Sequence, residues 1–214
     1  MLRALFGLLA CALLSGAPAG PDPHRDPSLL RPGLFLYAAP GLRETRFAET
    51  VVLLIEHGPG GSMGLVVNRP TEIPLHRALD EVEEARGSEL PVYWGGPVQP
   101  EAVLALVRTS RASPAAKPDL PGVHLTGDLA DVRAALAGKD PRGGLRVYSG
   151  YAGWTAGQLP DEVRAGVWVL DRADAASIFA PSPARLWPRV HLILDRLQVR
   201  RRPAPGTTPT PWPS

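Results

Sequence analysis

Runs of consecutive apolar residues dominate the first half of the chain, and glycine or proline ends each run. Residues 51–55 (VVLLI) are apolar at every position, which predicts a strand covered on both faces. A glycine-rich break follows, and residues 64–68 then read as the antiparallel partner in a hairpin. Further strands are predicted at residues 34–39, 92–94, 103–107, 145–148 and 167–170.

Helical periodicity is confined to short segments. One helix is predicted between Thr71, as its N-cap, and Gly87, a second over residues 129–137, and a last one from Pro183 onward, kinked or restarted at Pro188. The hairpin-length connections imply antiparallel pairing, and the irregular helix spacing does not fit a repeated βαβ unit. We therefore expect one α+β domain with a mostly antiparallel sheet and short flanking helices.

The first 19 residues read as a secretory signal. Arg3 gives a positive start, an apolar run follows, and residues 17–19 (APA) form a cleavage site. The run is too short to cross a bilayer, so no transmembrane helix is expected. The leader is cleaved after Ala19 in one interpretation and lipidated at Cys11, in a lipoprotein-like box, in the other. The remaining alternative is an apolar leader kept by a cytoplasmic protein, or a start codon placed too early.

Composition changes again beside both ends. Residues 20–31 contain three prolines among polar residues and are predicted to be a flexible tether, whereas residues 200–214 form an Arg- and Pro-rich tail predicted to be disordered. The folded domain is expected over residues 32–199. The formal net charge of +2 comes from Arg3 and from the three arginines of the tail, so the body is slightly acidic. No nucleic-acid partner is therefore expected for it.

Candidate chemistry is sparse. The lone cysteine excludes a disulfide framework and a thiolate zinc site, and neither a metal site nor a cofactor is predicted. Residues 60–64 (GGSMG) match the G-x-S-x-G pattern of serine hydrolases, but a strand follows Ser62 where that pattern needs a helix. Glu56 and His57 suit acid–base work. As neighbours on a strand they should face opposite sides, which favours a polar pair that closes a buried strand.

Residues 148–159 (YSGYAGWTAGQL) are the densest stretch of aromatic and glycine residues. Aromatic rings offer flat contact surfaces and glycine permits close backbone approach, so this segment is either a ligand-contact loop before a helix or a packing device in a tight turn. The packing interpretation is favoured.

Ordered motifs carry a family resemblance over residues 31–197. They are Arg31-Pro32-Gly33, Ala39-Pro40, Phe47, residues 51–54 with Glu56-His57, residues 64–70 (GLVVNRP), residues 95–98 (GGPV), residues 150–154 (GYAGW), residues 157–159 (GQL), Glu162, Trp168 and Leu186-Trp187. In this set the chain resembles the AlgH/YqgE family of small bacterial proteins. The resemblance implies a single α+β domain with a strongly bent sheet, no established activity, no catalytic residues to transfer, and a name that reflects a supposed role in alginate regulation.

Two departures from the family pattern stand out. Typical members have no leader, and Pro160 stands where a glutamate is usual, which favours a helix that begins at Pro160. The matching family positions nevertheless suggest a ligand-binding set. It comprises Glu56, His57, Asn68, Arg69, Tyr151, Trp154, Gln158 and Glu162.

These observations favour an exported, periplasmic, non-enzymatic binding or accessory domain whose small ligand or protein partner is unknown. Arg69 is expected to pair with Glu56 or Glu162 rather than with a ligand. The alternatives are a cytoplasmic transcriptional regulator and, less favoured, a serine hydrolase that uses Ser62 with Glu56 and His57. The hydrolase alternative requires the Ser62 hydroxyl to approach a histidine nitrogen beneath a cleft.

Overall fold

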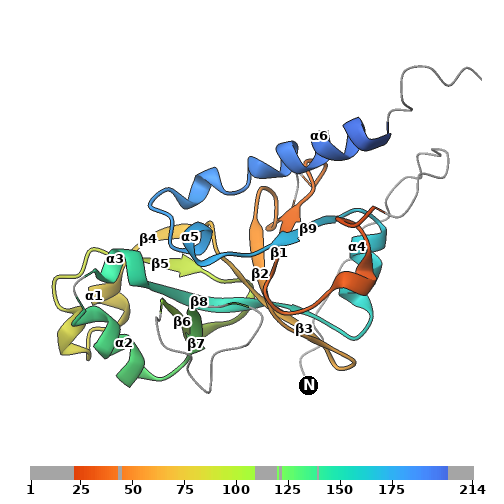
Figure 1. The fold of residues 1–214 in the computed structure, drawn as a ribbon. Helices are drawn as coiled ribbons and strands as arrows, with labels where there is room; N and C mark the ends of the chain where they lie inside the picture. Colours follow the sequence, from red (N-terminus) through yellow and green to blue (C-terminus); the bar gives the residue numbers. More distant parts are fainter. Residues whose placement is uncertain (1–21, 43–44, 109–119, 121, 139, 202–214) are drawn as a thin grey trace, which may run out of the picture.

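The computed structural model describes residues 22–42, 45–108, 120, 122–138 and 140–201. Within them a mixed sheet has the order β4-β5-β8-β3-β2-β1-β9, with β6 paired to β8 and β7 paired to β6 (Figure 1). The strands are β1 (Leu34–Ala38), β2 (Val51–Gly58), β3 (Gly61–Val66), β4 (Pro70–Pro74), β5 (Pro91–Trp94), β6 (Val98–Arg108), β7 (Val123–Thr126), β8 (Leu145–Trp154) and β9 (Trp168–Arg172).

Short helices flank this sheet. They are α1 (Leu75–Ala78), α2 (Leu129–Leu136), α3 (Pro141–Gly144), α4 (Gln158–Arg164), α5 (Ala175–Ile178) and α6 (Arg189–Arg201), with 3-10 turns η1 (Pro27–Leu29), η2 (Glu83–Ala85) and η3 (Pro183–Arg185). The pairs are antiparallel except for β5 with β8, where Val92 lies opposite Val147. The expected α+β class with a mostly antiparallel sheet is confirmed.

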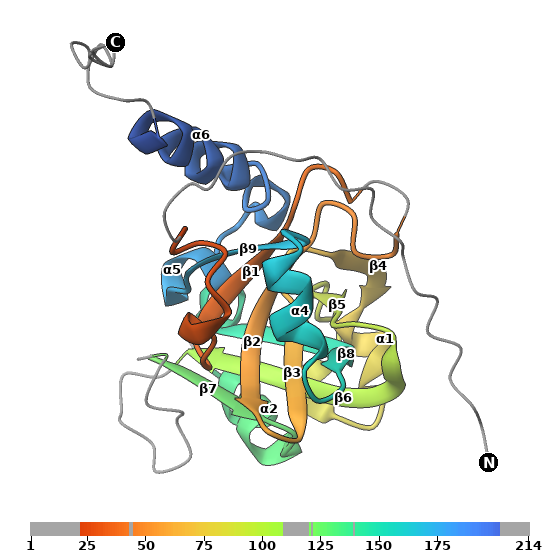
Figure 2. The ribbon, with the colours of Figure 1, turned by 90° about the vertical axis from the view of Figure 1, so that its right-hand side faces the viewer.

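Strand β2 is covered on both faces, as its apolar run predicts. Val51, Leu53 and Ile55 belong to one buried cluster, which also contains residues that follow α5 and the start of α6. Val52 and Leu54 belong to a second cluster on the opposite face. Figure 2 shows α4 in front of β2 and β3, where it closes the second cluster.

Strand β8 links the two halves of the sheet. Its first part pairs with β5 and β6, whereas its last part, from Ala152 to Trp154, pairs with β3. Residues 150–154, expected to be a loop, are therefore the end of a strand. The neighbouring backbones are close enough to require glycine. A Cβ atom on Gly95 would lie 2.1 Å from the carbonyl oxygen of Gly150.

The segment just before β1 packs against the domain, although its composition suggested a flexible tether over residues 20–31. The carbonyl of His24 accepts a backbone hydrogen bond of 2.8 Å from the Leu170 N–H of the edge strand β9. The ring Nδ1 of His24 lies 2.6 Å from the Leu170 carbonyl oxygen. The η1 turn contacts α4, and Leu30 is buried beside it. The packed domain thus includes residues 22–31.

The predicted helix between Thr71 and Gly87 is largely absent. Thr71 lies in β4 and donates its hydroxyl to the Val92 carbonyl at 2.7 Å, and α1 covers only four residues. The helix predicted over residues 129–137 is confirmed, capped by Asp128. Pro188 separates η3 from α6, as expected. The leader and the tail from residue 202 lie outside the described residues, and α6 reaches Arg201.

Candidate ligand-binding site

A bulge in the β2–β3 hairpin controls which side chains reach each face. Leu54 lies opposite Gly64, but Glu56 lies opposite Met63, so β2 has one extra residue at Ile55. Such a bulge bends a strand and changes the direction of the side chains that follow it. It cannot be read from the sequence, because it depends on the pairing of the two strands.

Beyond the bulge, His57, Ser62 and Trp154 form one row across β2, β3 and β8. His57 lies opposite Ser62, and Ser62 lies opposite Trp154. Residues directly opposite one another in antiparallel strands share a face of the sheet. His57 Nδ1 lies 2.8 Å from Ser62 Oγ, a hydrogen-bond distance. The approach that the hydrolase alternative requires is therefore present.

The neighbouring row lies on the other face and contains Glu56, Met63 and Gly153. Glu56 and His57 thus face opposite sides, as expected for neighbours on a strand. Tyr151 and Val98, paired in β8 and β6, stand next to this row. A Cβ atom on Gly153 would lie 3.6 Å from Tyr151 Cε2 and 3.4 Å from Val98 Cγ2, so both side chains flank the bare backbone of Gly153.

The two rows border an open hollow of about 680 Å³ at the end of the hairpin. Its lining consists of Glu56, His57, Gly58, Gly60, Gly61, Ser62, Met63, Val98, Tyr151, Gly153, Trp154 and Thr155. Four of the predicted site residues are thereby brought together, namely Glu56, His57, Tyr151 and Trp154. Met63, Val98 and Gly153 were not singled out from the sequence, although the GGPV and GYAGW motifs contain two of them.

Trp154 lines the hollow, and a hydrogen bond to α4 holds its ring in place. Its indole N–H donates to Glu162 Oε2 at 2.9 Å, and Trp168 donates to the same oxygen at 2.7 Å. Gln158 donates to the other carboxylate oxygen, Glu162 Oε1, at 2.9 Å. Glu162 and Gln158 therefore hold Trp154 from α4, and neither lines the hollow.

Helix α4 begins at Gln158 rather than at Pro160. Gly157 precedes it with a left-handed backbone (φ 79°), a conformation that favours glycine. Gln158 Oε1 accepts hydrogen bonds from the Thr155 backbone N–H at 3.0 Å and from its hydroxyl at 3.2 Å. The Gln158 side chain closes the turn with Thr155. The helix therefore begins before Pro160, the residue from which its start was predicted.

Asn68 and Arg69 follow the other end of β3, away from the hollow. Asn68 Oδ1 accepts a hydrogen bond from the Val51 N–H at 2.8 Å, and its Nδ2 donates to the Glu49 carbonyl at 2.9 Å. The Arg69 guanidinium donates to the carbonyls of Arg46 and Ala48 at 2.7 and 2.6 Å. The expected pairing of Arg69 with a carboxylate is thus replaced by carbonyl contacts, and burial lowers the pKa of Arg69.

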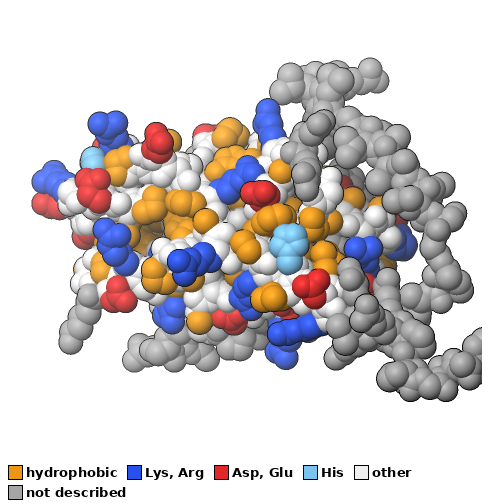
Figure 3. Space-filling model, turned by 90° about the horizontal axis from the view of Figure 1, so that it is seen from above, with side chains coloured by type: hydrophobic (Ala, Val, Ile, Leu, Met, Phe, Trp, Pro, Cys, Tyr) orange, Lys and Arg blue, Asp and Glu red, His pale blue; other side chains and the backbone are white. Residues whose placement is uncertain are grey.

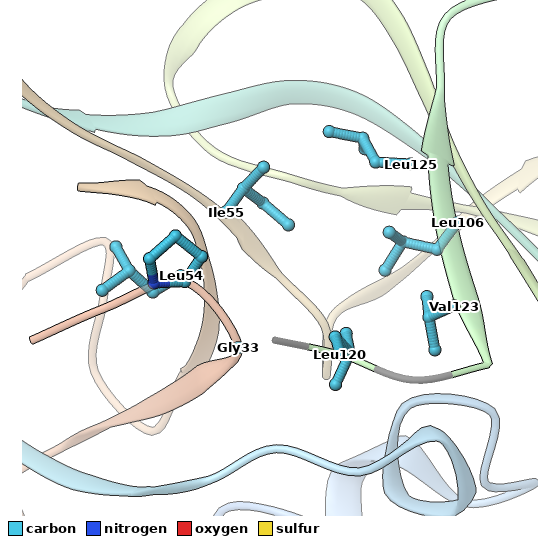
Figure 4. Close-up of a pocket in the computed structure, with 8 residues that line it drawn as sticks. Gly33, Leu54, Ile55, Leu106, Leu120, Val123 and Leu125 are labelled. Atoms are coloured by element: carbon cyan, nitrogen blue, oxygen red, sulfur yellow. The ribbon is translucent and has the colours of Figure 1, made fainter. Parts of the chain in front are cut away.

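A second, smaller cavity lies between β2, β6 and β7 (Figure 4). Its volume is about 20 Å³, and its walls are apolar, with Ile55, Leu106 and Val123 pointing into it. A space of this size holds at most one water molecule and offers it no polar partner among the labelled side chains. The cavity is a packing gap and does not suit a ligand.

Among the described residues, His, Cys, Asp and Glu side chains do not gather in groups of three that suit a metal ion. Within the same part of the chain, helices long and apolar enough to cross a membrane are absent.

The fold and the hollow together define a single-domain α+β protein with a candidate ligand site at a hairpin end. The chain belongs to the AlgH-like family, whose model matches residues 35–197. It is 35% identical over 156 residues to a UPF0301 protein of Thioalkalivibrio sulfidiphilus, covering 72% of this chain and 83% of that protein. Identity to a UPF0301 protein of Streptomyces coelicolor is 35% over 161 residues, with coverages of 74% and 83%.

Solved structures show the same fold. The solution structure of the AlgH protein from Pseudomonas aeruginosa matches with a TM-score of 0.59 and 25% identity, covering 87% of this chain and 98% of that one. A crystal structure of a Corynebacterium diphtheriae protein matches with a TM-score of 0.61 and 24% identity, covering 85% and 94%. The resemblance seen in the sequence motifs is confirmed, and the family carries no established activity.

Proposed function

We propose that this protein is an exported binding or accessory domain that takes a small ligand, or a side chain of a protein partner, in the hollow between the β2–β3 hairpin and β8. The observation that carries the proposal is that one hollow at the hairpin end is bordered by Glu56 and Tyr151 from one face of the sheet and by His57 and Trp154 from the other. The two strand ends that supply them lie far apart in the sequence, and ligand sites are usually concave with a few polar groups in the lining.

Hydrogen bonds hold several side chains of the lining in place, and this favours a binding role. Trp154 is fixed by Glu162, and the Ser62 and His57 side chains are joined by a hydrogen bond. Groups held in place before a ligand arrives lose little conformational entropy on binding.

The experiment is a fragment screen of the full chain by ¹H–¹⁵N correlation spectroscopy. We expect hits to shift the amide signals of residues 56–63 and 151–155, and Tyr151→Ala to abolish these shifts. Ile73→Ala is the matched control, because Ile73 is an exposed apolar residue on β4, outside the hollow. Hits that shift signals elsewhere, or hits unaffected by Tyr151→Ala, would contradict the proposal.

A serine hydrolase remains the second candidate, and the 2.8 Å contact between His57 Nδ1 and Ser62 Oγ is the observation that favours it. A nucleophile with an adjacent base is the core of such sites. Against it, Ser62 lies in a strand rather than at a strand-to-helix turn, and Glu56 faces away from His57. The third group that orients the base is thus not supplied by Glu56.

A fluorophosphonate probe tests this candidate. In the labelling reaction Ser62 Oγ bonds to phosphorus, fluoride leaves, and His57 takes the hydroxyl proton. Intact mass spectrometry of the full chain would show one adduct that is lost in Ser62→Ala. An unlabelled chain under conditions that label a known serine hydrolase removes the candidate and leaves the binding role.

The third candidate, a transcriptional regulator that binds DNA, receives less support from the surface charges. On the face seen in Figure 3, Lys and Arg side chains are scattered among acidic and apolar ones rather than gathered into a basic patch. A protein that binds the phosphate backbone usually concentrates its cations on one face.

Export is part of the proposal and rests on the leader pattern. Cleavage after Ala19 leaves every described residue in place, because the packed segment begins at residue 22. Intact mass of protein recovered from the periplasmic fraction should show a chain that begins at Gly20, or a lipid-modified Cys11. A chain that retains Met1 in the cytosolic fraction would contradict export.

A further inference from the structure

We propose that the N-terminal strap, residues 22–31, is an autoinhibitory cover of the sheet edge at β9, and that β9 pairs with β9 of a second copy of this chain when the strap is displaced. The motivating observation is that the N–H and the carbonyl of Leu170 in β9 both contact a single strap residue, His24. The inference concerns a different part of the molecule from the hollow and does not depend on the proposed ligand binding.

Strand β9 is the last strand on one side of the sheet and pairs with β1 over its whole length. The N–H of Leu170 donates to the His24 carbonyl, so Leu170 directs its main-chain groups away from β1. These groups alternate in direction along an antiparallel strand, so Trp168 and Arg172 face outward as well. The Arg172 N–H is bonded to the neighbouring Asp171 carboxylate at 2.8 Å. Outward main-chain groups of an edge strand form a template for another strand unless they are covered.

His24 covers this edge without continuing the sheet. Its carbonyl accepts from Leu170 at 2.8 Å, but its own N–H donates to Asp22 Oδ1 at 3.0 Å. The Leu170 carbonyl is contacted instead by the imidazole, whose Nδ1 lies 2.6 Å away. A side chain thus takes the place of a main-chain donor. Because His24 lies in a turn and not in a strand, the strap offers no new edge of its own.

The strap is anchored at its other end, which leaves the part on β9 free to move separately. Leu30 is buried beside α4, and η1 contacts the same helix (Figure 1). His24 reaches the outward groups of Leu170 alone, whereas a paired strand would also bond those of Trp168 and Arg172. A second strand therefore has more hydrogen bonds to gain at this edge than His24 supplies, and it can compete with the strap.

The charges of β9 favour a second copy as the occupant. In an antiparallel pair of two β9 strands centred on Leu170, Trp168 lies opposite Arg172 of the second copy, and Val169 lies opposite Asp171 of the second copy. The arginine and the aspartate each meet an uncharged residue, so like charges are not placed directly opposite one another, an arrangement that destabilises a sheet. The pair is symmetric and closes after two copies.

His24→Ala in the full chain tests the proposal by hydrogen exchange and light scattering. Loss of the imidazole loosens the strap, so we expect the Leu170 amide to exchange about tenfold faster in dilute solution. Between about 10 µM and about 1 mM this amide should regain protection while the measured mass doubles, whereas the parent chain stays monomeric. His76→Ala is the matched control, because the half-buried His76 also places its Nδ1 beside a main-chain carbonyl, that of Ser88 at 3.1 Å. It should behave like the parent.

Arg172→Pro in the His24→Ala background blocks the pairing. Proline at this edge position removes an outward N–H and leaves the bonds to β1 in place. We expect the double variant to stay monomeric, with a Leu170 amide that exchanges fast at every concentration. A His24→Ala chain whose Leu170 amide stays as protected as in the parent would overturn the cover. A chain that opens but stays monomeric, or that dimerises equally well with Arg172→Pro, would overturn the pairing through β9.

Discussion

Trp154 and Trp168 donate their indole N–H groups to the same oxygen atom, Oε2 of Glu162. Their rings meet edge to face, with centroids 5.9 Å apart. This arrangement fixes Trp154, which borders the hollow, to α4, the helix that covers the same face of the sheet as its ring. The site and the core are therefore coupled through one carboxylate.

Replacing this carboxylate is expected to destabilise the fold. In Glu162→Gln the single amide oxygen can accept the indole protons, but the new NH₂ group then faces the NH₂ of Gln158. A buried donor without an acceptor costs about 1–3 kcal/mol. Urea unfolding followed by tryptophan fluorescence measures the loss. Asp161→Asn is the control: it removes a surface pair with Arg164, and its effect should be within about 1 kcal/mol. Equal stabilities of the two variants would contradict the role given to Glu162.

Arg69 is expected to contribute to stability and not to ligand binding. Arg69→Lys keeps the charge but loses the two-pronged contact with the carbonyls of Arg46 and Ala48. The expected loss in unfolding free energy is about 1–3 kcal/mol. The amide shifts that fragment hits cause at residues 56–63 and 151–155 should be unchanged. A selective loss of these shifts, with stability intact, would return Arg69 to the ligand-binding set.

Stability should fall above pH 10. Burial raises the pKa of Tyr37 to about 12, and its hydroxyl has no hydrogen-bond partner among the described residues. Between pH 10 and 12 the unfolded tyrosine loses its proton while the folded one keeps it, so the unfolded state binds fewer protons and stability decreases as pH rises. The loss attributable to Tyr37 is about 2–3 kcal/mol.

The variant Tyr37→Phe isolates this effect. It removes the ionisable group and retains the ring, which meets Phe35 edge to face. Urea midpoints at pH 8 and pH 11 should differ less for Tyr37→Phe than for the unmodified chain. Burial also raises the pKa values of Tyr93 and Tyr148, so both add to the alkaline loss. Identical pH dependence of variant and parent would refute the assignment to Tyr37.

Two glycine substitutions should have opposite consequences. A Cβ atom on Gly153 meets its neighbours at 3.4–3.6 Å, which is ordinary contact, so Gly153→Ala should fold normally and weaken the binding of fragment hits by filling part of the hollow. A Cβ atom on Gly64 would lie 2.6 Å from Val52 Cγ1 and 2.8 Å from the Leu53 carbonyl oxygen, so Gly64→Ala should lose stability. Thermal unfolding and titration with a fragment hit distinguish the two variants.

The small cavity of Figure 4 offers a stabilising change. Val123 points into it from β7, and Val123→Ile adds one methylene to a β-branched side chain that remains suited to a strand. The expected gain is ~0.5–1 kcal/mol. Leu106→Ala, which enlarges the same cavity, should cost about 2–5 kcal/mol. A destabilised Val123→Ile variant would show that the cavity cannot accept the added group.

The elements that could be predicted from the sequence are those with a continuous apolar signal. The run at residues 51–55 has no polar face, so it predicts a strand that is buried on both sides, as the structure has it. The segment after Thr71 was misjudged, because its helical spacing of apolar residues competes with pairing of β4 to β5, which only the folded sheet provides. Local periodicity cannot report such a tertiary partner.

The site was partly predictable for a related reason. Tyr151 and Trp154 were selected as aromatic residues among glycines, but their placement in a strand follows from backbones that approach within contact of Gly95 and Gly61. The hydrogen bond between His57 and Ser62 depends on the bulge at Ile55, which shifts the register by one residue. Neither the close approach nor the register has a signal in the local sequence.

The long strand β8 has a consequence for how the polypeptide is made. Leu145–Trp154 supplies the partner for β3, β5 and β6, all of which precede it in the chain. A ribosome-bound chain that has not reached residue 145 therefore presents open edges at three strands, and such edges readily capture other chains. The edges of these three strands are covered only after β8 has been translated, so we expect chains that end upstream of this strand to aggregate.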